Sequence, residues 1–176
     1  MGMYKYIREA WSKPRKDPLY KEKLLQWKKQ PSTVRIEHPT RLDRARALGY
    51  KAKQGFIIVR QKVNRGGRMR PQFKKGRRSK HMRRKKIVNI NYKQVAEQRA
   101  QKSYTNMEVL NSYFVGKDKS YYWYEIILID RSHKQVLKKH PFVKKEKGRV
   151  YRGKTAAGRK SRGILTHKGK GAEKLR

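Results

Sequence analysis

The segment GYKAKQGFIIVRQKVNRGGRMRP, residues 49–71, joins a strand pattern to the start of a strongly basic region. Side chains alternate between the two faces of a strand, so residues 56–63 present two rows. One row can lie on a core throughout: Ile57, Val59, Gln61 and Val63. The other row begins with Phe56 and ends with Lys62, so it changes from apolar to cationic along the strand. We expect a small folded core to end here and a polyanion-binding arm to begin.

The charge of the whole chain sets the class of partner. The 176 residues include 51 Lys and Arg but only 12 Asp and Glu, which gives a net charge of +39. Self-repulsion on this scale opposes a compact state unless a partner neutralises it. Eleven Tyr, four Phe and three Trp nevertheless argue against disorder throughout. We expect a modest core with cationic extensions that order on a polyanion. Nucleic acid is the favoured polyanion, and a membrane surface is the weaker candidate.

The composition also excludes several classes of site. The chain has no cysteine, so disulfides, thiolate metal sites and cysteine nucleophiles are ruled out. No apolar run approaches the ~20 residues of a membrane span. The N-terminus lacks the apolar block of a signal peptide, so we expect a cytoplasmic protein. The five histidines show no metal-ligand spacing. We expect no metal, no cofactor and no enzymatic activity.

Periodicity predicts a mixed set of elements. We expect helices over residues 3–11, 19–29, 40–48, 92–102 and 132–139. We expect strands over residues 34–37, 56–63, 108–115 and 121–130. The turn at 116–120 is short enough to make the last two strands an antiparallel hairpin. Thr40, Asn91 and Ser132 are the expected helix N-caps, and Gly49 is expected at a helix C-terminus. Glu97 and Glu108 are expected to pair with nearby cations.

A long acid-free run indicates phosphate binding. Residues 44–96 contain 19 Lys and Arg and not one Asp or Glu. Soluble surfaces normally mix both signs of charge, whereas binding to phosphates with release of counterions explains the run directly. Arginine is well suited to such contacts because its planar guanidinium bridges phosphate oxygens and stacks on bases. The candidate RNA-binding residues of this run are Arg44, Arg46, Arg60, Lys62, Arg65, Arg68, Arg70, Lys74, Lys75, Arg77, Arg78, Arg83 and Arg84.

The C-terminal region is also basic. Residues 144–176 carry 13 Lys and Arg against two acids, and glycines recur at 148, 153, 158 and 163. We expect an extended tail over residues 141–176, whose glycines allow close approach to a phosphate backbone. Lys154 is a further candidate contact.

One motif in this tail would suggest a nucleotide hydrolase. Residues 148–155, GRVYRGKT, match the P-loop pattern GxxxxGK[ST], and IILID at 126–130 resembles the acid-ending strand of such enzymes. A P-loop must follow a buried strand and open a helix, but here it follows Lys144-Lys-Glu-Lys147 and precedes Gly158 and Gly163. We therefore interpret the match as chance and expect no bound nucleotide.

Several blocks resemble a known family. They are GMYKYIREAW (2–11), RLDRARALGYKAKQGFIIVRQKVNRGGRMRP (41–71), VAEQRA (95–100), EVLNSYFVGKDKSYYWYEIILID (108–130) and TAAGRKSRG (155–163). The chain resembles the large-subunit ribosomal protein fifteen of the archaeal and eukaryotic type, almost from end to end. Its length looks more archaeal than eukaryotic.

The resemblance implies an α+β core, in which helices pack on a small antiparallel four-stranded sheet, and long basic extensions buried in 23S-type ribosomal RNA. On this basis residues 1–64 and 87–140 are expected to form one core, with an arm at 65–86 and a tail at 141–176. The family residues that carry over as expected RNA contacts are Lys51, Lys53, Arg60, Arg65, Arg68, Arg70, Arg159, Lys160 and Arg162. The resemblance implies a structural, non-catalytic role, with ribosomal RNA and neighbouring large-subunit proteins as partners. A free RNA chaperone that coats nucleic acid without a fixed site remains the alternative.

Overall fold

A single four-stranded sheet organises the part of the chain that the computed structural model describes, which is residues 2–14, 17–67 and 90–164. Its strands are β1 (Thr33–Ile36), β2 (Phe56–Asn64), β3 (Met107–Lys117) and β4 (Tyr121–Asp130). All three pairings are antiparallel, and the strand order is β1-β2-β4-β3. The predicted α+β fold, including the hairpin of the last two strands, is confirmed.

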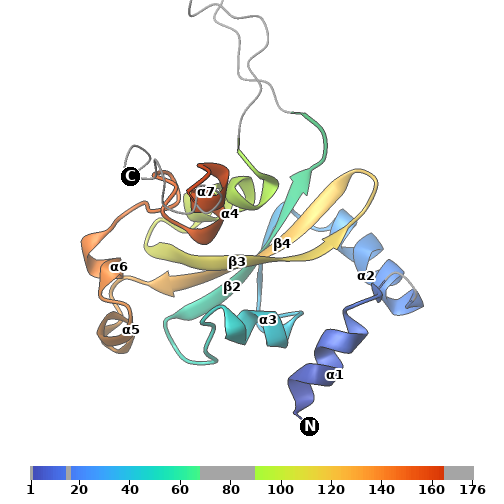
Figure 1. Ribbon diagram of the computed structural model, residues 1–176, viewed down its shortest axis with the longest axis horizontal. Coiled ribbons are helices and arrows are strands. Elements are labelled where there is room, and N and C mark those ends of the chain that lie inside the picture. Colours follow the sequence, from blue (N-terminus) through green and yellow to red (C-terminus); the bar gives the residue numbers. More distant parts are fainter. Residues whose placement is uncertain (1, 15–16, 68–89, 165–176) are drawn as a thin grey trace, which may run out of the picture.

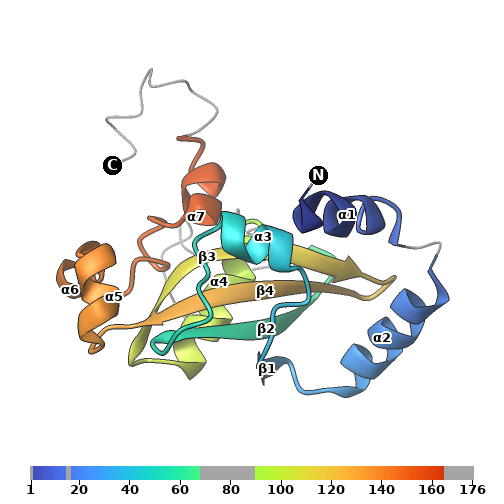
Figure 2. The ribbon, with the colours of Figure 1, turned by 90° about the horizontal axis from the view of Figure 1, so that it is seen from below.

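Helices cover both faces of this sheet (Figures 1 and 2). On one face lie α4 (Tyr92–Ser103) and α7 (Ala156–Ser161), and on the other lies α3 (Leu42–Ala47). Next to α3 is α1 (Met3–Ala10), and α2 (Pro18–Lys29) lies toward the hairpin end of the sheet. At the opposite end, α5 (Lys134–Lys139) and α6 (Phe142–Lys145) follow β4.

Strand β4 is the centre of two separate cores. Ile126 and Leu128 pack on the α4 side of the sheet, whereas Trp123 and Ile127 pack on the α3 side. All four side chains are at most 1% exposed. A strand between two neighbours and two helical layers must be apolar on both faces, which explains the run YYWYEIILID. The two rows of β2 divide in the same way, with Val59 in the first core and Ile58 in the second.

Two buried carboxylates tie outlying segments to the two faces of the sheet. Glu97 of α4 is fully buried and accepts hydrogen bonds from the hydroxyls of Ser112 and Thr155. Glu125 of β4 is equally buried and accepts from Thr40 and from the Tyr113 hydroxyl. Burial raises the pKa of both carboxyls, and these donors oppose the rise. Glu97 therefore anchors residues 155–161, and Glu125 anchors the start of α3.

These contacts correct three expectations. Glu97 accepts hydrogen bonds from two hydroxyls, and the nearby charges of Lys93 and Arg149 also lower its pKa. Glu108 Oε1 accepts a 2.6 Å hydrogen bond from the Gly148 amide. Neither glutamate is among the ion-paired acids of the described residues. Thr40 does not cap α3, because its amide and hydroxyl both donate to Glu125. Ser132 does not cap α5, which begins after His133.

Two other expected helix ends are confirmed. Asn91 Oδ1 caps α4 by accepting a 2.7 Å hydrogen bond from the Gln94 amide. Gly49 follows α3 with a φ of +98°, a conformation that glycine adopts without a Cβ clash.

The C-terminal region differs from the extended tail predicted for residues 141–176. Through residue 164 it is folded, and Val143 and Val150 are fully buried. Gly148 and Gly153 have φ values of +69° and +65°, so they reverse the chain toward the sheet and α4. Thr155 then caps α7 by accepting from the Gly158 amide. The recurring glycines thus form turns that bring residues 148–161 back onto the core, and residues 165–176 lie outside the described part.

Replacing Gly158 by alanine should weaken this C-terminal packing. A Cβ on Gly158 would lie 2.5 Å from Gly153 Cα and 2.7 Å from its carbonyl carbon, both backbone atoms that cannot rotate away. We expect the free energy of unfolding to fall by about 3 kcal/mol, at the upper end of overpacking effects. Urea unfolding measures this. Gly67→Ala is the matched control because no atom lies within 4 Å of its Cβ position. Equal stabilities of the two variants would contradict this packing.

Candidate nucleic-acid interface

Most of the described acidic residues are buried or have a partner within the protein. Glu97, Glu108 and Glu125 are fully buried. Four more form ion pairs, namely Glu9, Asp43, Asp118 and Glu146. Asp17 and Asp130 each accept from a backbone amide two residues ahead. The exposed Lys and Arg side chains greatly outnumber the exposed acids, which are Glu9, Asp17, Glu22 and Glu37, so the described surface has a strong positive field.

The two cationic residues of β2 bind groups within the protein. Arg60 is 9% exposed, its guanidinium lies 4.5 Å from the Trp27 ring centroid, and it donates a 2.8 Å hydrogen bond to Gln30 Oε1. Lys62 Nζ donates to the carbonyls of Lys28 and Gln30, where α2 ends. A cation at a helix C-terminus satisfies its last carbonyls and favours its dipole. Arg60 and Lys62 therefore join α2 to the sheet, which differs from the exposed position expected for RNA contacts.

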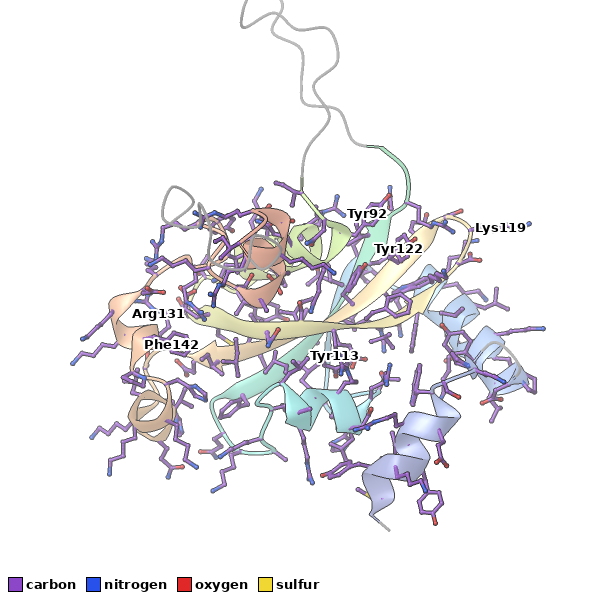
Figure 3. The ribbon with its side chains drawn as sticks, viewed as in Figure 1. Tyr92, Tyr113, Lys119, Tyr122, Arg131 and Phe142 are labelled. Atoms are coloured by element: carbon purple, nitrogen blue, oxygen red, sulfur yellow. The ribbon has the colours of Figure 1, made fainter. Side chains whose placement is uncertain are left out.

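The last described residues before position 68 are held by tyrosines. Tyr92 stacks on Tyr122 with ring centroids 4.9 Å apart, and Figure 3 shows both beside the end of β2. The Tyr92 hydroxyl hydrogen-bonds the amide and the carbonyl of Gly66, both at 2.9 Å. Arg65 is exposed, lies 5.1 Å from the Tyr122 ring centroid and donates to the Asp118 carbonyl. These contacts hold Arg65 and Gly66 at the end of β2.

Replacing Tyr92 by phenylalanine should loosen this attachment. The ring stack remains, but the hydrogen bonds to Gly66 are lost, and one such bond contributes about 1 kcal/mol. We expect the Gly66 amide to exchange with solvent roughly fivefold faster, which hydrogen-exchange NMR can measure. Tyr6→Phe is the control, because Tyr6 is an exposed tyrosine of α1. An unchanged Gly66 rate in Tyr92→Phe would contradict this role.

A second group of cations comes from three helices. Arg44 of α3 and Lys160 of α7 are exposed. Burial lowers the pKa of Lys93 of α4, and the charges of Arg44 and Lys160 lower it further, against the opposing effect of Glu97. The fold therefore brings together positive charges from positions 44, 93 and 160. Of these, Lys93 was not singled out from the sequence, because one lysine in a helix is usually a solvated residue.

The remaining candidates occupy varied positions. Arg46 donates to the Tyr4 hydroxyl of α1 while staying exposed. Lys51 and Lys53 are exposed in the loop before β2, and Arg159 is exposed on α7. Arg162 donates to the Arg152 carbonyl. The candidates outside the described residues are Arg68, Arg70, Lys74, Lys75, Arg77, Arg78, Arg83 and Arg84.

The P-loop-like residues 148–155 have structural partners. Lys154 Nζ forms a 2.6 Å ion pair with Glu146, and the Thr155 hydroxyl donates to Glu97. The preceding element is the short helix α6, not a buried strand, and α7 has only six residues. Turns, an ion pair and a helix cap therefore explain the pattern GxxxxGKT in this chain.

The described residues lack two other kinds of site. None of their His, Asp and Glu side chains gather in groups of three that could hold a metal ion. Within the same ranges, no helix has the length and apolar composition needed to cross a membrane.

Comparison with known proteins identifies the family. The family model described as Ribosomal L15 matches residues 2–176. The chain belongs to the ribosomal L15 family. Two curated archaeal relatives match this chain over nearly its full length. The protein from Methanocorpusculum labreanum is 49% identical over 181 residues, covering 99% of this chain and 93% of its own. The protein from Methanocella arvoryzae is 49% identical over 179 residues, covering 97% and 91%. Both are named large ribosomal subunit protein eL15.

Proposed function

We propose that this protein is a structural component of the large ribosomal subunit that binds 23S-type ribosomal RNA through its basic surface and basic segments. Family membership and the archaeal relatives named large ribosomal subunit protein eL15 support the ribosomal role. The observation that carries RNA binding is the distribution of charge. Residues 44–96 contain no acid, and the described acids elsewhere are largely buried or paired.

The mechanism is charge neutralisation on a folded support. Phosphate groups of RNA helices repel one another, and Lys and Arg side chains placed between them replace condensed counterions. The sheet and its helices hold some of these cations at fixed positions, such as Arg44 and Lys160 on different helices. Such contacts position the protein on RNA without reading base sequence. The basic segments at 68–89 and 165–176 extend the same chemistry in this proposal.

No catalytic role is part of this proposal. The family is one of structural ribosomal proteins, and Lys154 and Thr155 already have partners in Glu146 and Glu97. We infer that the chain binds no nucleotide despite its P-loop-like match. Its partners are ribosomal RNA and neighbouring large-subunit proteins, and its place is on the cytoplasmic ribosome.

Co-sedimentation separates this role from that of a free RNA chaperone. The tagged chain is expressed in an archaeal host, and large subunits are isolated and washed at high salt. A structural component should remain at one copy per subunit, because a fixed site engages the folded core as well as phosphates. A protein that only coats nucleic acid should be washed away, since its binding is electrostatic. Complete loss of the chain from the subunit would overturn the proposal.

A further inference from the structure

A cavity lies between the loop before β2 and helix α5. Both elements lie at the end of the sheet where β4 runs into α5 (Figure 1). Its volume is about 330 Å³. Phe56 and Val136 contribute apolar surface, and four lysines line its walls. They are Lys51, Lys53, Lys138 and Lys139. The first two were expected RNA contacts, but the last two lie about 85 residues further along the chain and were not.

The two walls of this cavity are held at a fixed distance by tight packing. A Cβ on Gly55 would lie 2.7 Å from Val136 Cγ2, so only glycine permits the observed approach of loop and helix. Gly55 has a φ of +85°, and its carbonyl accepts a 2.9 Å hydrogen bond from the Asp130 amide. The Phe56 and His140 rings meet edge to face at 6.1 Å. The lysines are therefore carried by a rigid frame.

The lysines of this cavity form no ion pair within the described chain. No Asp or Glu is among the described residues that line it, and the five ion pairs of the described chain involve other cations. The neighbouring Lys51 ammonium lowers the pKa of Lys139. Burial, followed by the charges of Lys51 and Lys139, lowers the pKa of His140. Like charges held this close favour an anion that accepts hydrogen bonds from several ammonium groups at once.

We propose that Lys51, Lys53, Lys138 and Lys139 form a pocket for one backbone phosphate of large-subunit ribosomal RNA. This rests on the function proposed above and names a phosphate subsite on the folded core, separate from the basic segments. A phosphodiester fits because its oxygens accept from ammonium groups on opposite walls, and lysine binds phosphate as a point charge. The Lys51 loop also belongs to the acid-free run 44–96 that we assign to RNA.

Lysine footprinting tests the pocket residue by residue. The full chain is acetylated with an amine-reactive ester, with and without protein-free large-subunit RNA, and modification at each lysine is read by mass spectrometry. We expect RNA to slow acetylation of Lys51 and Lys139 severalfold. Inorganic phosphate at the same phosphate concentration should protect neither, because a single free anion lacks the other contacts of the RNA chain. Equal protection by inorganic phosphate, or none by RNA, would overturn the pocket as an RNA site.

Paired substitutions supply a second readout. Removing one phosphate contact should make the slope of log K against log salt shallower by about 0.9. We expect this change in Lys51→Ala/Lys139→Ala, and we expect Lys51→Arg/Lys139→Arg to keep the wild-type slope because arginine retains the charge. Lys23→Ala/Lys29→Ala, on the exposed surface of α2, controls for the loss of two charges. Equal slopes in the pocket and control alanine pairs would contradict the pocket.

These outcomes separate the two proposals. If the wild-type chain binds RNA with a steep salt dependence while Lys51 and Lys139 stay unprotected, only the pocket is wrong. If the wild-type chain binds RNA without salt dependence, the proposed function itself fails.

Discussion

Raising the salt concentration from about 50 to about 200 mM should weaken the affinity of this protein for large-subunit RNA by about 10³–10⁵-fold. This range applies to a protein that contacts six to ten phosphates, since each contact releases a condensed counterion. The exposed cations of α3, of α7 and of the loop before β2, together with the basic segments, offer contacts on that scale. A filter-binding or fluorescence titration at several salt concentrations measures the slope.

The control for this experiment shows that salt does not unfold the protein. Circular dichroism at both salt concentrations should show the same spectrum, because the core is held by buried apolar side chains and buried hydrogen bonds. A nearly flat salt response with an intact fold would contradict binding through phosphates.

Replacing Glu125 by alanine should lower the free energy of unfolding by about 3–5 kcal/mol, the usual range for removing one partner of a buried charged interaction. Thr40 and Tyr113 would lose their common acceptor. Arg60, which lies opposite Glu125 in the β2–β4 pairing, would lose a compensating negative charge. Because the carboxylate anchors the start of α3, the damage should extend beyond the site of the substitution.

Urea unfolding at fixed salt tests this prediction. Glu22→Ala is the matched control, because Glu22 is exposed on α2 and its loss should change stability by no more than about 0.5 kcal/mol. If Glu125→Ala lost less than about 1 kcal/mol, the buried carboxylate would not be an anchor for α3.

The sheet could be predicted because its pattern is local. Alternating or continuous apolar runs at 56–63, 108–115 and 121–130 need no remote information, and turn residues separate them. The helix cap at Asn91 and the glycine after α3 were likewise predictable from adjacent residues. Thr40 was misjudged because its partner, Glu125, lies 85 residues away. The Thr40 hydroxyl can either cap the adjacent helix or donate to a remote carboxylate. The sequence alone does not show which of these contacts forms.

The candidate site was harder to predict for the same reason. Arg60 and Lys62 look like surface cations in the strand pattern. In the structure Trp27 and Gln30 cover Arg60, and the carbonyls at the end of α2 hold Lys62. The glycines of residues 148–163 suggested an extended chain, whereas Gly153 and Gly158 allow close backbone packing that only the folded structure reveals. Lys138 and Lys139 become candidate contacts only in the folded protein, where α5 packs beside the loop before β2. Composition indicated a polyanion partner, but tertiary contacts decide which cations remain available to it.

A map of the assembled large subunit containing this chain tests the central claim most directly. We predict RNA phosphate oxygens within about 4 Å of the cationic groups of Arg44, Lys51, Lys139 and Lys160, the range of a direct ion pair. Arg60 should instead retain its contacts with Trp27 and Gln30. If these four cations faced solvent, or if the chain were absent from the subunit, RNA binding through the folded core would be contradicted.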